Sequence, residues 1–323
     1  MCASVSARTS AVEASRVTYR YGQIEALSDL DLSIPQGALY ALLGANGSGK
    51  TTLLQILMGV RRAMRGSVSL FGVDSRALGL RERATISYIA EGQPLPEWMT
   101  LAQLEAYVAP LYATWDTALA AELRERFGLD ATRKIGALSR GQQMQAALLC
   151  ALAPRPRLLV MDEPFTGMDA VVKDDLVHGL LESSGRGDWT VLVCSHDIGE
   201  LELLADWVGV LDAGRMLLSE PMDVLQSRFK RIEAAIGGDA SVETVIARQT
   251  AEWMAVERAG RRMTFLVSDA DADVEQRVAR ELPPGSQVAV RDASLREIFV
   301  ALARSARRTR ATRVDSARTQ EVA

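Results

Sequence analysis

The chain has 323 residues, of which 48% are apolar and 24% charged, a composition typical of a globular protein with one large core or two smaller ones. Lys and Arg together number 37 and Asp and Glu 41, so the net charge of -4 gives no general field for holding nucleic acid, and no nucleic-acid partner is expected. The sequence shows neither a run of about 20 apolar residues nor the layout of a signal peptide, which predicts a cytoplasmic protein.

Short apolar runs alternate with longer helical stretches over Val17–Ser219, a pattern typical of βα units in a mostly parallel sheet. The predicted buried strands are Leu39–Leu43, Ser87–Ile89, Leu158–Met161, Val191–Cys194 and Val208–Leu211. Over Thr100–Leu129 apolar residues recur at helical spacing with no strand between them, which indicates an inserted helical subdomain over about residues 92–150. An α/β domain is therefore expected over about residues 17–219.

The character of the sequence changes after residue 225. Two strands are predicted there, Met263–Val267 and Gln287–Val290. Two helices are also predicted, Val274–Glu281 and Leu295–Arg304. They indicate a small α+β accessory domain over residues 226–303. The final stretch, residues 304–323, carries six arginines among small polar residues without an apolar face, which predicts a disordered Arg-rich tail.

A phosphate-binding loop with the sequence GANGSGKT runs from Gly44 to Thr51, after the strand Leu39–Leu43 and before a predicted helix. Its glycines let backbone N–H groups converge on phosphate oxygens at a helix N-terminus, where the helix dipole favours negative charge. Lys50 is predicted to contact the β- and γ-phosphates and Thr51 to offer its hydroxyl to Mg²⁺. The predicted nucleotide-binding residues here are Gly44, Asn46, Gly47, Ser48, Gly49, Lys50, Thr51 and Thr52.

Two adjacent carboxylates, Asp162 and Glu163, follow the apolar strand Leu158–Met161. At the carboxyl end of a parallel strand such groups face the phosphate site. Successive side chains of a strand point to opposite faces, so the two acids are expected to do different work. We assign Asp162 to Mg²⁺ and Glu163 to the general base that activates water.

The segment LSRGQ, residues 138–142, resembles the signature motif of ABC-family ATPases, with Arg140 where the family usually has Gly. The family's other motifs are present in order: Tyr21 before the phosphate loop, the segment PFTGMD ending at Asp169, and His196 after a buried strand. The resemblance covers about residues 12–225 and implies a P-loop NTPase fold of the ABC ATPase type.

The resemblance also implies a paired arrangement. In ABC ATPases two nucleotide-binding domains face head to tail, and each ATP lies between the phosphate loop of one and the signature motif of the other. We therefore expect a homodimer or pseudo-homodimer, with Ser139, Gly141 and Gln142 contacting nucleotide across it and Asp169 at the dimer interface. Ser139 and Gly141 are predicted to begin a helix, whose N-terminus favours phosphate.

Two further roles follow from the resemblance. His196 occupies the place of the family's switch histidine, which hydrogen-bonds the γ-phosphate, so the expected catalytic residues are Lys50, Glu163 and His196. Tyr21 is expected to stack on adenine, with Tyr19 as the alternative.

The loop that joins the nucleotide site to the helical subdomain departs from the family pattern. It normally opens with Gln after a strand, and here Glu91 stands in that place. We assign Glu91 to the metal, and Gln93 is the alternative if the loop is shifted in register. A carboxylate at this position is able to coordinate Mg²⁺ but adds negative charge beside the γ-phosphate.

The function predicted from these motifs is that of the ATPase subunit of an ABC transporter, with ATP and Mg²⁺ as cofactors. A separate polytopic membrane permease is expected to dock between Gly92 and Leu111, placing the chain on the inner face of the cell membrane. Ser294–Leu302 and the sequence Trp98-Met99-Thr100 resemble ABC-2-type drug, lipid and antibiotic exporters, which indicates export. The alternatives are a soluble ABC ATPase acting on a nucleic-acid or ribosomal partner and a regulator with an inactive site.

Overall fold

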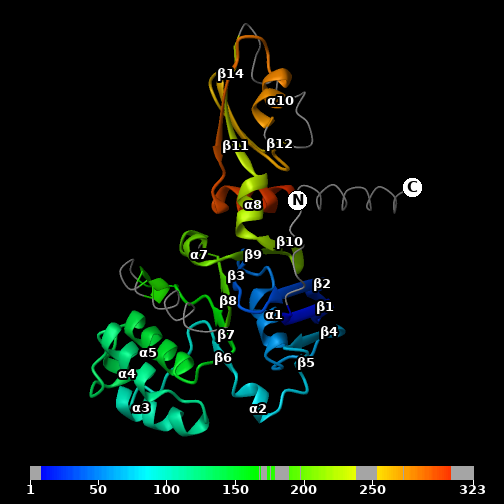
Figure 1. The fold of residues 1–323 in the computed structure, drawn as a ribbon. Coiled ribbons are helices and arrows are strands. Elements are labelled where there is room, and N and C mark those ends of the chain that lie inside the picture. Colours follow the sequence, from blue (N-terminus) through cyan, green and yellow to red (C-terminus); the bar gives the residue numbers. More distant parts are fainter. Residues whose placement is uncertain are drawn as a thin grey trace. The chain divides into compact units, whose positions relative to one another are not determined.

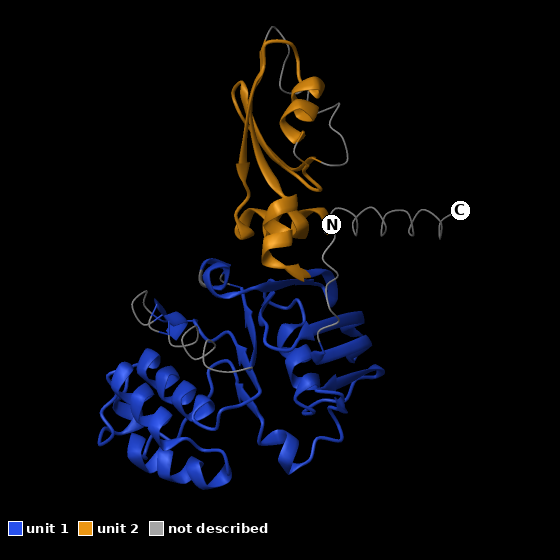
Figure 2. Ribbon diagram, viewed as in Figure 1, with its two compact units in different colours: residues 1–219 blue, residues 220–323 orange. Residues whose placement is uncertain are grey.

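A computed structural model describes residues 9–166, 168, 173–174, 176–178, 189–196, 198–237, 253–271 and 273–306. The chain divides into two compact units, Met1–Ser219 and Glu220–Ala323 (Figure 2). The division lies slightly before the expected boundary at residue 225, because helix α8 (Met222–Arg228) belongs to the second unit. Within the described ranges, every helix is too short or too polar to cross a bilayer.

A six-stranded sheet in the order β10-β9-β3-β8-β7-β6 forms the centre of the first unit (Figure 1). Its strands are β3 (Leu39–Leu43), β6 (Ile86–Ile89), β7 (Leu158–Asp162), β8 (Thr190–Ser195), β9 (Trp207–Asp212) and β10 (Arg215–Pro221). The run β9-β3-β8-β7-β6 is parallel throughout, as predicted. All residues of β7 and β8 are buried, which explains why their sequences are continuous apolar runs.

The parallel arrangement positions the candidate site. The carboxyl ends of β3, β7 and β8 share one edge of the sheet, so the segments that follow these strands converge there. The phosphate loop follows β3, Glu163 follows β7 and His196 follows β8. Helix α1 (Lys50–Leu57) begins at the end of the loop and is held by a buried apolar face, made of Leu53, Leu54, Ile56 and Leu57.

A second, antiparallel sheet of the first unit was not predicted from the sequence. It has the order β2-β1-β4-β5 and consists of β1 (Ser10–Tyr21), β2 (Ile24–Pro35), β4 (Arg65–Leu70) and β5 (Val73–Asp74). Register shifts interrupt the pairing of β1 with β2, and Arg16 and Asp29 within them have φ of 48°. Such bulges break the regular alternation of apolar and polar residues by which a strand is identified.

Helical elements occupy most of the interval in which the sequence predicts an inserted subdomain. They are α3 (Leu101–Val108), the 3₁₀ turn η1 (Ala109–Leu111), α4 (Thr117–Arg126), η2 (Ile135–Ala137) and α5 (Arg140–Leu152), and α3, α4 and α5 lie together (Figure 1). Thr100, Asp116 and Ser139 cap the three α-helices with side-chain oxygens. The short helix α2 (Leu80–Arg83) precedes β6.

The second unit is a four-stranded antiparallel sheet in the order β12-β13-β11-β14, with helices beside it (Figure 1). Its elements are β11 (Lys230–Ala235), β12 (Trp253–Ala259), β13 (Arg262–Val267), α10 (Val274–Glu281), β14 (Gln287–Asp292) and a helix over 295–306. The sequence predicted β13, β14 and both later helices but missed β11 and β12. Trp253 of β12 stacks on Phe265 with ring centroids 4.1 Å apart, in the same core as Val274 and Val278 of α10.

The last described helix extends beyond its expected end at Arg304, to residue 306. Arg304 therefore does not begin a disordered tail, and its guanidinium lies 3.4 Å from the carboxylate of Glu257. The rest of the expected tail, residues 307–323, lies outside the described residues.

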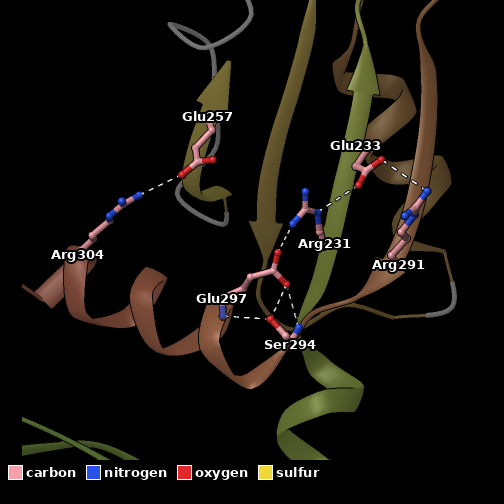
Figure 3. Close-up of polar contacts among 7 residues, drawn as sticks. All are labelled: Arg231, Glu233, Glu257, Arg291, Ser294, Glu297 and Arg304. Carbon is pink, nitrogen blue, oxygen red and sulfur yellow. Dashed lines mark hydrogen bonds and ion pairs between the residues drawn. The ribbon is translucent and has the colours of Figure 1, made fainter. Parts of the chain in front are cut away.

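A polar cluster fixes the beginning of this helix (Figure 3). The Ser294 hydroxyl and backbone N–H donate to one carboxylate oxygen of Glu297 at 2.9 and 3.0 Å, and the Glu297 N–H donates back to the hydroxyl at 3.3 Å. Arg231 of β11 pairs with the other oxygen of Glu297. This reciprocal cap stabilises the helix and ties it to the sheet.

Removing the Glu297 charge is expected to destabilise the second unit in a pH-dependent way. Partial burial alone would raise the pKa of Glu297, but hydrogen bonds from Ser294 and the Arg231 guanidinium outweigh it and hold the pKa below its usual 4.5. The stabilisation is therefore complete above about pH 4.5 and is lost as the pH falls through the lower, folded-state pKa. We expect Glu297→Gln to reduce the free energy of unfolding by about 1 kcal/mol at pH 7.

Thermal unfolding of wild type and Glu297→Gln from pH 7 to pH 3 tests this expectation. The difference between the two proteins should shrink below pH 4.5, the usual pKa of the group. Glu257→Gln is the control, because Glu257 is 69% exposed and its ion pair is worth little. A difference that stays constant over the whole range would contradict the role given to the Glu297 charge.

Candidate functional site

A pocket lies along the phosphate loop and collects residues from segments far apart in the sequence. It is lined by Tyr21, Ile24, Glu25, Ala26, Ala45, Asn46, Gly47, Ser48, Gly49, Lys50, Thr51, Thr52, Glu91, Glu163, Thr166 and His196. Most of the residues predicted for one nucleotide site are thus brought together. Ile24, Glu25 and Ala26 come from the unpredicted strand β2, and sequence reasoning missed them for that reason.

Two glycines of the loop are required by its geometry. Gly49 has φ of 111°, and a Cβ atom at this position would lie 2.5 Å from the carbonyl oxygen of Ala26. A Cβ at Gly44 would lie 2.4 Å from the Ser48 hydroxyl and 2.7 Å from the carbonyl of Leu211. At these two positions the backbone of the loop therefore packs directly against its surroundings.

Lys50 is held in a buried ion pair. Its Nζ lies 3.1 Å from Oε1 of Glu163, and both side chains are only 6% exposed. The same Nζ donates a hydrogen bond to the carbonyl of Gly44 at 2.6 Å. The cation predicted to contact phosphate thus lies beside the predicted general base.

The other carboxylate oxygen of Glu163 is held by groups at the end of β8. Oε2 lies 2.7 Å from Nδ1 of His196 and accepts the His196 backbone N–H at 3.2 Å. It also accepts the Ser195 hydroxyl at 3.1 Å, a contact that the sequence analysis missed although Ser195 directly precedes His196. Glu163 itself has φ of 49°, an uncommon conformation for a residue other than glycine and one that is typical of functional sites.

Asp162 differs from Glu163 in the hydrogen bonding of its carboxylate. It is 1% exposed, and neither of its carboxylate oxygens has a hydrogen-bond partner among the described residues. Burial raises the pKa of Asp162, and the carboxylates of Glu163 and Glu91 raise it further. The Thr51 side chain and Lys50 lower the pKa of Asp162. Buried carboxylate oxygens without donors, next to a hydroxyl and a further carboxylate, form the hard oxygen set that suits Mg²⁺.

Glu91 and Gln93 occupy different surroundings. Glu91 lines the pocket and is close enough to Asp162 to affect its pKa. The Gln93 side chain turns back on its own loop, where its amide oxygen accepts the backbone N–H of Ala90 at 3.1 Å. The loop geometry thus favours Glu91 over Gln93 for the metal-facing position.

Tyr21 lies at the edge of the pocket and is 42% exposed. Its hydroxyl is 3.3 Å from Oγ1 of Thr52. The rings of Tyr19 and Tyr21 pack edge to face with their centroids 5.1 Å apart. Tyr19 is half-buried, so Tyr21 offers more open ring surface of the two.

The signature segment lies elsewhere in the first unit. Ser139 caps helix α5, with its hydroxyl accepting the Gln142 N–H at 3.2 Å and its own N–H donating to the Gln142 side chain at 3.2 Å. Ser139, Gly141 and Gln142 are not among the residues that line the pocket. Asp169, the predicted interface residue, lies outside the described residues.

Comparisons with known proteins show which family this chain is similar to. Residues 27–166 match the family model described as ABC transporter. The ABC transporter ATP-binding protein YtrB of Bacillus subtilis is 29% identical over 279 residues, covering 86% of this chain and 92% of that protein. The Fe(3+) ions import ATP-binding protein FbpC of Streptomyces coelicolor is 34% identical over 240 residues, covering 69% of each.

Solved structures show the same fold. A structure of the ATP binding subunit of an ABC transporter is 25% identical to this chain and superimposes with a TM-score of 0.61. The match covers 67% of this chain and 92% of that one. The predicted P-loop NTPase fold of the ABC ATPase type is therefore confirmed.

Proposed function

Since the chain belongs to the ATP-binding proteins of ABC transporters, we propose that two copies close around ATP and power export through a separate membrane permease. Members of this family bind ATP with Mg²⁺ and hydrolyse it, and this chain is an ATPase subunit of that kind. The observation that carries the proposal is the contact of Glu163 with both Lys50 and His196 at the phosphate loop. Lys50, Glu163 and His196 line one pocket, which supports their proposed roles in hydrolysis.

Each residue has a part in hydrolysis that its position supports. Lys50 and the loop N–H groups hold the β- and γ-phosphates in line for attack. Glu163 accepts the proton of the attacking water, and His196, held beside it, orients that carboxylate and the γ-phosphate. Asp162, Thr51 and Glu91 would hold Mg²⁺, which would neutralise phosphate charge when bound.

The signature residues act across a dimer. Ser139 and Gly141 stand at the N-terminus of α5, which favours an anionic ligand, yet they lie outside the pocket of their own chain. A second copy in head-to-tail orientation brings its α5 to the phosphates and completes each site. Asp169 is assigned to the same interface.

A permease docks on the helical subdomain and holds the chain at the inner face of the membrane. The support is an exposed apolar group within the predicted docking segment: Trp98 is 69%, Tyr107 62% and Leu111 66% exposed. A soluble ATPase acting on nucleic acid or ribosomes is not favoured, because YtrB and FbpC are ATP-binding proteins of transporters.

Export rather than import is supported by the second unit. The segment Ser294–Leu302 resembles the corresponding part of exporter ATPases of the ABC-2 type.

Membrane association and direction are tested together in the source cells. Tagged wild-type chain should sediment with membranes, and Trp98→Glu should release it without changing its basal ATP turnover. A strain from which this chain's gene is deleted should accumulate lipophilic antibiotics or dyes. It should also become sensitive to them. A strain defective instead in uptake of a nutrient would refute export, and wild-type chain that never associates with membranes would refute the transporter assignment.

Glu91→Gln is expected to change the metal dependence of hydrolysis. The carboxylate strengthens the hold on Mg²⁺ but repels the γ-phosphate, so its neutralisation should raise the Mg²⁺ concentration for half-maximal turnover severalfold and increase turnover at saturating Mg²⁺. Steady-state ATPase rates across a Mg²⁺ titration measure both quantities. Gln93→Ala is the control and should change neither; loss of activity in Gln93→Ala with no effect of Glu91→Gln would place Gln93 in the site.

A further inference from the structure

A guanidinium group packs on the aromatic ring that lies at the edge of the nucleotide pocket. The Arg61 guanidinium carbon is 4.9 Å from the ring centroid of Tyr21 and 5.7 Å from that of Tyr19. Both distances are within the range in which a cation is attracted to the face of an aromatic ring. Neither the family motifs nor the sequence analysis assigns any role to Arg61.

Arg61 is fixed in place from both ends. Its backbone N–H donates to the carbonyl of Gln55 at 3.0 Å, and its Nε donates to the side chain of the same Gln55. Its Nη1 donates to the hydroxyl of Tyr19 at 3.0 Å. Gln55 belongs to α1, the helix that begins with Lys50, so the helix that presents the phosphate-binding lysine also supports the tyrosine pair.

Tyr21 is covered on one side and open on another. The ring lines the pocket, whereas Arg61 is not among the pocket's lining residues. The ring therefore meets the pocket with surface that the guanidinium does not cover. Its hydroxyl is 3.3 Å from Oγ1 of Thr52, so contacts with Thr52, Arg61 and Tyr19 together restrain the ring.

We propose that Arg61 is a positioning residue for the purine base, acting through the Tyr21 ring. This inference rests on the proposed assignment of Tyr21 to adenine. A cation on one face of the ring withdraws π-electron density and so strengthens stacking of an electron-rich purine on the open face. The restrained ring also loses less conformational freedom when the base binds. Arg61 is not among the residues that line the pocket, so we expect its effect to be confined to ligands that carry a base.

Binding of ATP and of inorganic tripolyphosphate, both with Mg²⁺, separates a base effect from a phosphate effect. Isothermal titration calorimetry of Arg61→Met should show ATP bound about three- to tenfold more weakly, with tripolyphosphate affinity unchanged. Arg62→Met is the matched control, since Arg62 is the exposed next residue, and should alter neither affinity. Arg61→Lys keeps the charge without the planar group and should recover part of the loss.

Two further readouts distinguish positioning from general structural support. Arg61→Met should raise KM for ATP and leave kcat unchanged, and it should add nothing to the loss already caused by Tyr21→Leu. Equal weakening of ATP and tripolyphosphate, or a full Arg61→Met effect in the Tyr21→Leu background, would overturn the proposal. Wild-type protein that binds neither ligand would instead refute the nucleotide site itself, whereas normal ATP affinity in Arg61→Met would refute only the role of Arg61.

Discussion

Glu163→Gln is expected to reduce ATP turnover by about 10²- to 10⁴-fold, the usual contribution of a general base, while nucleotide binding is retained. The amide cannot accept the proton of the attacking water. It keeps the size of the side chain and an oxygen that accepts hydrogen bonds from Ser195 and from the His196 backbone. Steady-state ATPase assays and equilibrium binding of ATP measure the two quantities separately.

The same variant should accumulate as an ATP-bound dimer. Closure depends on phosphate and Mg²⁺ contacts that remain, and reopening depends on hydrolysis that is lost. Size-exclusion chromatography with Mg-ATP should show the dimer for Glu163→Gln. Glu25→Gln is the control, because Glu25 lines the same pocket but pairs with Arg20 at the surface. Wild-type turnover in Glu163→Gln would remove Glu163 from the role of base.

Lys50→Met is expected to abolish ATP binding and also to destabilise the nucleotide-free protein. The loss of binding follows from removal of the phosphate-binding cation. The loss of stability follows from the buried ion pair, in which Lys50 Nζ lies 3.1 Å from Glu163 Oε1. Without Lys50, the Glu163 carboxylate, which is only 6% exposed, loses this neighbouring positive charge. Breaking such a pair costs about 3 kcal/mol, the lower end of the usual range, because Glu163 keeps its contacts with Ser195 and His196.

The two effects of Lys50→Met are separated by a second substitution. Lys50→Met combined with Glu163→Gln removes both charges, so most of the stability should return while ATP binding stays lost. Chemical denaturation without nucleotide measures the first quantity and calorimetric titration the second. If the double variant is as unstable as Lys50→Met alone, the ion pair is not the source of the destabilisation.

The residues around the phosphate loop were predictable because their signals are local. The loop requires glycines at fixed positions between a strand and a helix, and the parallel strands that precede Glu163 and His196 are unbroken apolar runs. Parallel topology then brings the ends of these strands together. The ABC-type fold and the ATPase activity inferred from these segments agree with the comparisons.

Other features depend on contacts that no local pattern records. The irregular pairing of β1 with β2 breaks the alternation of apolar and polar residues, so neither strand was predicted. The pocket residues Ile24 to Ala26 of β2 were therefore missed as well. The packing of Arg61 on Tyr21 joins the segment that follows α1 to β1, and the hydrogen bond from Arg61 to Tyr19 spans 42 positions. Only the folded backbone brings such groups together.

ATP hydrolysis by this chain should need both Glu163 and a second copy that completes the site. The direct measurement is ATP turnover per chain over a range of protein concentrations, with the oligomeric state at each concentration determined by analytical ultracentrifugation in Mg-ATP. We predict no turnover where the chain is monomeric and a rise that follows the dimer fraction, with Ser139→Arg inactive at all concentrations although it binds ATP. Full turnover by a chain that remains monomeric in Mg-ATP would contradict the account.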